Sequence, residues 1–149
     1  MEHGLYYQQF ELGKRIVTPG RTVTEADIVN FAGLSVDFNS IHTDAAYSAG
    51  SFYEKRGAHG LLVLSIASGL AVRTGMMEGT VLAWREISDW RFSQPVFIGD
   101  TVQVELEVSE TKPMPRLNAG MVGLEVQVNN QDGKTVMNGR WSLLVLNQP

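Results

Sequence analysis

The sequence contains no cysteine among its 149 residues. This absence excludes disulfide bonds, a thiolate nucleophile and cysteine-ligated zinc, and it is typical of a reducing compartment, so we expect a cytoplasmic protein. Basic residues are also few: 12 lysines and arginines stand against 16 acidic residues, and they are scattered rather than gathered in a stripe. We therefore expect no nucleic-acid partner.

Long apolar runs are absent as well. The longest covers residues 61–72, is interrupted by two serines and a glycine, and is too short to span a bilayer, so we read it as a buried helix and expect no membrane partner. Residues 1–4 lack a basic region followed by an apolar one, and we expect no signal peptide. The length suits one domain with a real core, and we expect a single domain over residues 1–149.

The first half of the chain carries helix signals. Thr24 and Asp27 form a capping box before apolar residues at helical spacing, and Gly33 is the expected end of that helix. Asp44 is expected to cap a short helix that ends near Gly50. Residues 61–73 are apolar almost all round, which predicts a helix enclosed on most sides. Residues 37–44 have no period and are expected to form a loop.

The second half carries strand signals. Apolar and polar residues alternate over residues 102–108 and 122–128, and strands are also expected over 80–92 and 136–146, whereas 6–17 is a weaker strand candidate. The turn at 131–134 predicts a hairpin. This order predicts an α+β fold in which a curved antiparallel sheet wraps around a long central helix. Long strands expose their edges, so we expect a homodimer joined edge to edge.

An acid–base pair stands out in this framework. Asp37 and His42 are five residues apart, and His59-Gly60 follows at the start of the apolar helix. Free N–H groups at a helix start can bind an oxyanion, and a carboxylate with an imidazole can move a proton. This combination is typical of chemistry that moves a proton next to a carbonyl group.

Three sequence blocks then point to a family. From about Thr24 to Leu146, the chain resembles the MaoC-like, (R)-specific enoyl-CoA hydratases of the hotdog fold. The blocks are Asp37-x-Asn39-x-x-His42-x-Asp44, His59-Gly60, and Phe92-x-x-Pro95-Val96-x-x-Gly99-Asp100-Thr101. Two positions depart from the family pattern: Val36 replaces a glycine and Ser40 replaces a proline. Valine disfavours a positive φ and serine leaves φ free, so both changes alter how rigidly Asp37 and His42 are presented.

The resemblance implies reversible addition of water to a trans-2-enoyl-CoA, giving the (R)-3-hydroxyacyl-CoA. Asp37 is the implied base toward water, and His42 holds that water and helps to return a proton to Cα, although the sequence does not divide the steps between them. A solvated carboxylate is a weak base, so the site is expected to desolvate Asp37. The Gly60 amide is the implied oxyanion donor, and one such donor is worth about 3 kcal/mol in the transition state.

Other site residues have two interpretations each. Asn39 and Ser68 are implied to bind substrate, but Asn39 is favoured as a loop-former, and Ser68 lies about 12 Å along the helix from Gly60 and could simply bond the preceding turn. His59 is expected to tie down the loop before the helix. His42 with Asp44 lacks a third ligand, so no metal is expected. No cofactor is expected beyond the coenzyme A of the substrate, whose phosphates residues 112–116 could meet; a solvated hairpin loop is the favoured interpretation.

Three alternative functions stay open. The first is a 3-hydroxyacyl dehydratase that acts on acyl-carrier-protein thioesters by the same chemistry. The second is a hotdog thioesterase, whose water must attack the carbonyl carbon instead of Cβ. The third is a non-catalytic acyl-thioester-binding protein, which the departures at Val36 and Ser40 keep open and the intact Asp37 and His42 count against.

Overall fold

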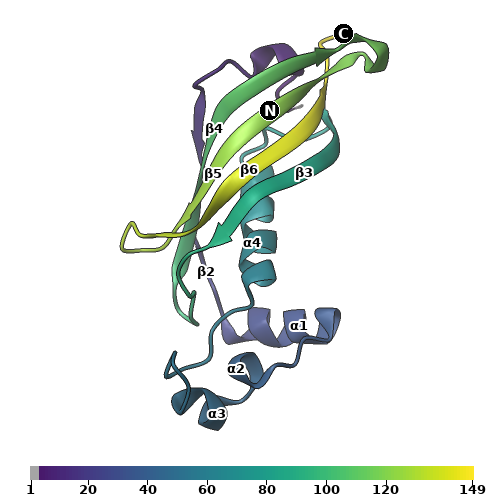
Figure 1. Ribbon diagram of the computed structural model, residues 1–149. Helices are drawn as coiled ribbons and strands as arrows, with labels where there is room; N and C mark the ends of the chain where they lie inside the picture. The colour runs from purple at the N-terminus through teal and green to yellow at the C-terminus, as the bar shows by residue number, and fades with distance from the viewer. Residues whose placement is uncertain (1–3) are drawn as a thin grey trace.

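The computed structural model describes residues 4–149 and shows a curved antiparallel sheet with one long helix on its concave face (Figure 1). The four long strands are β3 (Val81–Phe92), β4 (Thr101–Met114), β5 (Ala119–Asn129) and β6 (Thr135–Leu146). Two short strands, β1 (Arg15–Val17) and β2 (Arg21–Thr22), pair with β4. The strand order is β1-β4-β5-β6-β3, so β3 forms one edge of the sheet. The predicted α+β class is confirmed.

The alternating sequence pattern explains how the sheet buries one face. In β4, Val104 and Leu106 are buried, whereas Glu105 and Glu107 point toward solvent or lie at the surface. Successive side chains of a strand point to opposite faces, so this spacing places the apolar residues against the helix. Trp141 of β6 is fully buried at the centre of the core. The four strands predicted in the second half of the chain are thus confirmed, with β4 and β5 longer than the alternation suggested.

The central helix α4 (Gly60–Arg73) packs only part of its surface. Its buried residues are Leu62, Val63, Ile66, Ala67, Leu70 and Ala71. Leu61 is 62% exposed and Val72 is 45% exposed on the remaining surface. The predicted enclosure on most sides is therefore wrong for one face of the helix, which carries apolar residues that no described residue covers. None of the helices within residues 4–149 is long and apolar enough to cross a membrane.

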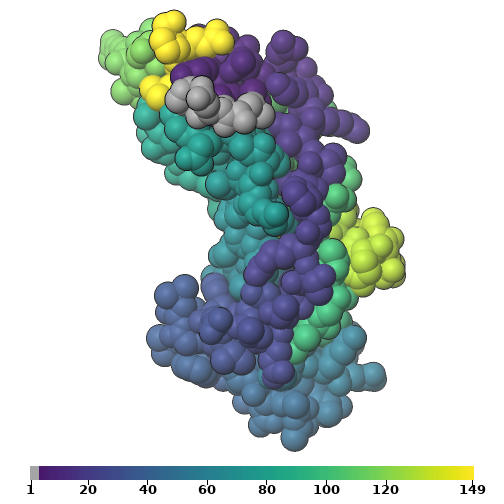
Figure 2. Space-filling model, turned by 180° about the vertical axis from the view of Figure 1, so that it is seen from behind, coloured from purple at the N-terminus to yellow at the C-terminus, as the bar shows by residue number. Residues whose placement is uncertain are grey.

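The three remaining α-helices gather at one end of the molecule (Figure 1). They are α1 (Glu25–Ser35), α2 (Ser40–Thr43) and α3 (Ala45–Ala49). In Figure 2 these slate-blue residues form the lower end, below the teal of α4. The capping box is confirmed, since Asp27 Oδ2 accepts from the Thr24 N–H at 2.8 Å. The predicted cap by Asp44 is also confirmed, because its Oδ1 accepts from the Tyr47 N–H at 2.9 Å.

Three local predictions are wrong. The first helix continues past Gly33 and ends at Ser35, where Val36 takes the left-handed conformation with φ of 64°. Residues 40–43 form a helical turn instead of loop, because Asn39 caps it. The weak strand candidate at residues 6–17 is mostly not a strand: it begins with a 3₁₀ turn, η1 (Tyr7–Gln9), and only β1 at its end is extended.

Candidate active site

His42 lies on α2 and is fixed by its ring. Its Nδ1 is 2.7 Å from the carbonyl oxygen of Gly57, which lies on the loop before α4. Because a carbonyl oxygen only accepts hydrogen bonds, Nδ1 carries the hydrogen. This tautomer leaves Nε2 as the accepting nitrogen of the ring. A water or substrate group placed at Nε2 would therefore meet a proton acceptor held in a defined orientation.

Asp37 lies in the short turn between α1 and α2, close to His42. A carboxylate oxygen of Asp37, a ring nitrogen of His42 and a ring nitrogen of His59 all lie within 4.8 Å of one another. The Asp37 Oδ1 also accepts from the Asn39 N–H at 3.2 Å, which orients the carboxylate. The structure therefore brings Asp37 and His42 together, and it adds His59, which the sequence had suggested only as a brace.

Asn39 and Asp44 serve as helix caps. Asn39 Oδ1 accepts from the Ile41 N–H at 3.3 Å and begins α2, which agrees with the loop-forming interpretation. Asp44 is engaged with the first turn of α3. Both side chains thus satisfy backbone donors that a helix start leaves open. A substrate-binding role for Asn39 stays a prediction.

Gly60 is the first residue of α4 and lines a cleft of about 440 Å³ together with His42. Its N–H has no hydrogen-bond partner within the described part of the chain. A Cβ added at Gly60 would lie 2.8 Å from two ring atoms of Phe92, so glycine permits the ring of Phe92 to pack directly on the helix start. A free amide, a helix dipole and a cleft meet at this residue, which is the arrangement that an oxyanion site requires.

Ser68 lies outside this cleft. Its Oγ donates to the carbonyl oxygen of Ser65 at 2.7 Å, one turn earlier in α4. It lines a second cavity of about 410 Å³ with Trp84 of β3, and Leu61 lines both cavities. The bond to the preceding turn agrees with the simpler interpretation of Ser68, and its contact with substrate stays a prediction.

Asp37 is exposed in this single chain. The expectation that the site desolvates Asp37 is therefore not met by the described residues alone. The apolar face of α4 that carries Leu61 is also open to solvent. Any desolvation of the carboxylate must come from bound substrate or from another chain.

Asp37, His42 and His59 are three side chains of the types that bind metal ions, so the structure supplies the third ligand that the pairing of His42 with Asp44 lacked. The rings of His42 and His59 stack with centroids 3.8 Å apart and planes at 30°. A ring nitrogen offers its lone pair in the plane of the ring, and a metal ion must lie about 2.1 Å from it. Lone pairs of two stacked rings that are 30° from parallel do not meet at so short a distance. The observed stacking therefore favours a proton-transfer or bracing role for these side chains, and the expected lack of a metal stays a prediction.

The two departures from the expected motif have different structural consequences. Ser40 is the first residue of α2, a position that also suits proline. The serine in this chain therefore takes the same helical position that the proline of the family pattern would take. Val36 takes the positive φ that a glycine would adopt without strain. Valine disfavours a positive φ because of its branched Cβ, yet the fold imposes a positive φ on Val36, one residue before Asp37.

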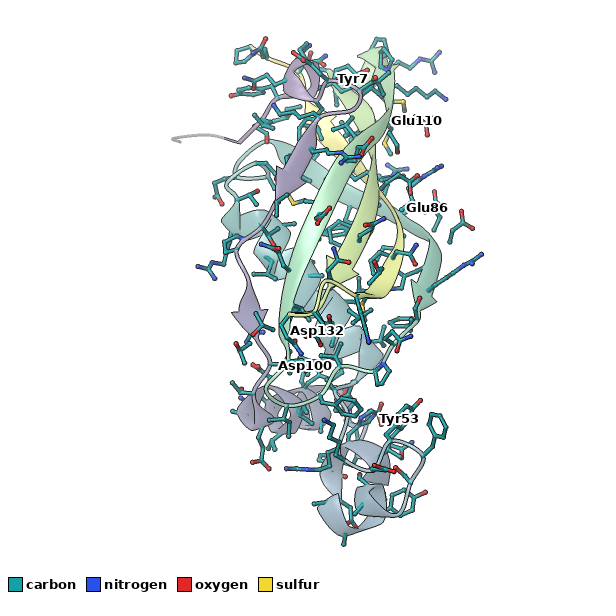
Figure 3. The ribbon with its side chains drawn as sticks, turned by 90° about the vertical axis from the view of Figure 1, so that its left-hand side faces the viewer. Tyr7, Tyr53, Glu86, Asp100, Glu110 and Asp132 are labelled. Atoms are coloured by element: carbon teal, nitrogen blue, oxygen red, sulfur yellow. The ribbon has the colours of Figure 1, made fainter. Side chains whose placement is uncertain are left out.

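Residues 112–116 lie far from this cleft. They form the end of β4 and the start of the 3₁₀ turn η2 (Pro115–Leu117). Figure 3 places Glu110 near one end of the molecule and Tyr53, which lines the cleft, at the other. Contact between residues 112–116 and the phosphates of a thioester bound at His42 of the same chain is therefore the wrong interpretation, and the hairpin connection favoured above agrees with the structure.

The fold and the site together define a class. A conserved Mycobacterium tuberculosis protein described as having a double hotdog fold matches this structure with a TM-score of 0.85, at 20% identity, over 98% of this chain and 45% of that one. The curved sheet wrapped around α4 is accordingly a hotdog fold. The MaoC-like domain matches residues 8–130. The chain belongs to the MaoC-like domain family.

Particular relatives include hydratases by name. Protein MaoC from Klebsiella aerogenes is 43% identical over 101 residues, which are 68% of this chain but only 30% of that protein. An (R)-specific enoyl-CoA hydratase from Aeromonas caviae is 35% identical over 113 residues, 74% of this chain and 81% of that one. A solved structure of a monoamine oxidase regulatory protein from Archaeoglobus fulgidus is 36% identical, with a TM-score of 0.90 over 99% of this chain and 97% of that one.

Proposed function

We propose that this protein is a hydro-lyase that reversibly hydrates trans-2-enoyl-CoA to (R)-3-hydroxyacyl-CoA. The observation that carries the proposal is the approach of the Asp37 carboxylate to the ring nitrogen of His42, within 4.8 Å, next to a cleft that opens onto the Gly60 amide. Membership of the MaoC-like family and the hydratase name of the Aeromonas caviae relative support the same reaction class.

The proposed reaction gives each of these groups a role. Water lies between Asp37 and His42 Nε2; Asp37 removes a proton from it while the oxygen bonds to Cβ of the substrate. The electrons of the C=C bond move toward the thioester, whose oxygen becomes negative and accepts from the Gly60 N–H. The acid–base pair then returns a proton to Cα, which completes the addition of one water. The reverse order of steps is dehydration.

The proposed carrier is coenzyme A, with no further cofactor. The chain has a formal net charge of −4, which gives an acidic carrier protein no electrostatic attraction. A dehydratase that uses acyl-carrier-protein thioesters is the alternative with the same chemistry. A thioesterase and a non-catalytic binding protein are the alternatives from other functional classes. Neither function requires an acid–base pair, such as Asp37 and His42, that adds water to Cβ.

We also propose that the working form is a homodimer. Strand β3 is an open edge of 12 residues, and the neighbouring groove along α4 exposes apolar side chains of Phe31, Leu61, Leu64, Trp84 and Ile87. A second chain paired along β3 would cover this groove, and Leu61 connects it to the cleft. Covering the groove would reduce the exposure of the site to water.

The test follows hydration of a panel of trans-2-enoyl-CoAs of increasing chain length at the absorbance of the enoyl thioester. Asp37→Asn is expected to lower turnover by about a hundredfold or more, as loss of a general base does. Asp44→Asn is the matched control, because it changes a carboxylate in the same segment that only caps α3. An Asp37→Asn variant that keeps wild-type turnover would remove Asp37 from the mechanism.

The same panel separates the alternatives. Release of free thiol without hydration would identify a thioesterase. Binding of crotonyl-CoA without any turnover by the wild-type protein would identify a binding protein. Hydration of acyl-carrier-protein thioesters at a much higher kcat/KM than coenzyme A thioesters would identify the carrier-protein dehydratase.

A further inference from the structure

His59 is the most buried titratable side chain at the site, and the proposed reaction does not use it. It is 3% exposed and stands immediately before α4. It does not line the cleft, whereas its neighbour Gly60 does. Its Nδ1 is buried with no hydrogen-bond partner among residues 4–149. Leaving a buried polar atom unpaired costs about 1–3 kcal/mol, so packing alone would favour an apolar ring at this position.

The ring of His59 contacts both members of the acid–base pair by different means. Its Nε2 lies 2.9 Å from the backbone oxygen of Asp37, and because that oxygen only accepts, Nε2 carries the hydrogen. Its face stacks on the ring of His42, with centroids 3.8 Å apart. The ring of Phe31 from α1 also packs against the ring of His59, with ring centroids 5.0 Å apart. One buried side chain thus contacts the backbone of Asp37 and the ring of His42.

We propose that His59 is a positioning residue that holds Asp37 and His42 in register; the inference rests on the proposed function. The bond to the Asp37 carbonyl fixes the peptide plane between Asp37 and Phe38, and the strained Val36 precedes Asp37 on the other side, so the direction in which the carboxylate leaves the backbone is restrained. The ring of His59 packs on the face of the His42 ring, while the carbonyl oxygen of Gly57 accepts a hydrogen bond from its Nδ1; together these contacts fix the orientation of His42. Asp37 is exposed, and its carboxylate is otherwise held only by the N–H of Asn39 two residues on, so the bond from His59 is the link that ties Asp37 to the start of α4.

The N–H donor can be separated from the ring by substitution. His59→Phe keeps an aromatic ring for stacking but loses the donor and the unpaired nitrogen. His59→Gln keeps an N–H donor near the position of Nε2 without the ring. If His59 served only the stability of the fold, Phe would be the better replacement; if it positions Asp37, Gln would be.

The experiment measures kcat, KM and thermal unfolding of the two variants with crotonyl-CoA. For His59→Phe we expect kcat to fall by about a hundredfold, as a misplacement of about 1 Å does, with KM changed less than about threefold. The unfolding temperature is expected to stay within about 3 °C of wild type. His59→Gln restores the donor to Asp37 but not the ring that stacks on His42, so it is expected to recover part of the lost kcat. A His59→Phe variant with wild-type kcat, or a His59→Gln variant as slow as it, would overturn the proposal.

A readout that is independent of turnover keeps this inference separate from the proposed function. The amide nitrogen of Phe38 shares the peptide group of the Asp37 carbonyl, so its NMR shift reports the hydrogen bond to that carbonyl. The shift is expected to move in His59→Phe and to return in His59→Gln. An unchanged shift refutes the positioning role even if the wild type hydrates crotonyl-CoA. A wild type without hydratase activity refutes the proposed function, and the shift still decides the role of His59. If His59→Phe does not fold, His59→Asn, whose amide is too short to reach Asp37, takes its place.

Discussion

Replacing Val36 with glycine should stabilise the fold. Val36 has φ of 64° and ψ of 13°, in the left-handed region, where a side chain with a Cβ costs about 1–2 kcal/mol. Its side chain is 75% exposed, so removing it sacrifices little buried surface. Glycine instead loses about 0.4–1 kcal/mol through the greater entropy of the unfolded chain. The difference leaves about 0.5–1 kcal/mol of added stability, or an unfolding temperature raised by about 2–3 °C.

The assay is urea and thermal unfolding of Val36→Gly beside a matched control. Val29→Gly changes a half-exposed valine within α1, where φ is helical, and there glycine should lower the free energy of unfolding by about 0.5 kcal/mol. Opposite signs at two valines of the same segment would identify backbone conformation as the cause. The reasoning is refuted if both substitutions destabilise the protein equally.

Two further substitutions test the helix start and the capping box. Gly60→Ala places a Cβ 2.8 Å from the ring of Phe92, so kcat/KM for crotonyl-CoA should fall at least about tenfold. Ser65→Ala, on the exposed face of α4, is the control and should keep the wild-type kcat/KM. Equal kcat/KM values for the two variants would show that the close approach of Phe92 to Gly60 is not needed. Burial alone would raise the pKa of Asp27, but hydrogen bonds from Thr24 and Arg21 hold that pKa below its ordinary value of 3.8. Because the folded pKa is the lower one, the carboxylate contributes stability above pH 3.8 that is lost as pH falls further through the folded value. Asp27→Asn should therefore be less stable at neutral pH and lose stability less steeply below that point in a pH series of urea unfolding; parallel curves for the two proteins would contradict this.

Local patterns predicted most of the fold because they report local physics. Alternation in residues 102–108 decides which face of a strand is apolar, and Thr24 with Asp27 supplies the donors and acceptors that start a helix. The predicted end of α1 at Gly33 is wrong because the helix continues through this glycine to Ser35. Val36 then takes the left-handed conformation that ends the helix, although glycine would adopt it more easily. The exposed face of α4 was missed because an all-round apolar sequence does not say which contacts come from the same chain.

The site was predicted in part for a similar reason. The spacing of Asp37 and His42 sufficed to suggest an acid–base pair, and the pair does come together. The contacts of His59 with His42 and with Asp37, which is 22 residues earlier in the chain, join two segments that are distant in sequence, and no periodicity encodes such contacts. The one signal available was the position of His59 directly before Gly60, which marks it as part of the helix start but not as a neighbour of Asp37.

The imidazoles of His42 and His59 each donate a hydrogen bond to a main-chain oxygen, that of Gly57 and that of Asp37 respectively, and not to a side chain. Every residue type supplies a carbonyl, so this scaffold tolerates sequence drift at the positions around it. Wall residues of the cleft such as Ile41, Tyr53 and Ala58 can then be exchanged for larger or smaller ones while the reacting groups stay where they are. A combinatorial library confined to those wall positions would explore new acyl shapes without having to rebuild the chemistry.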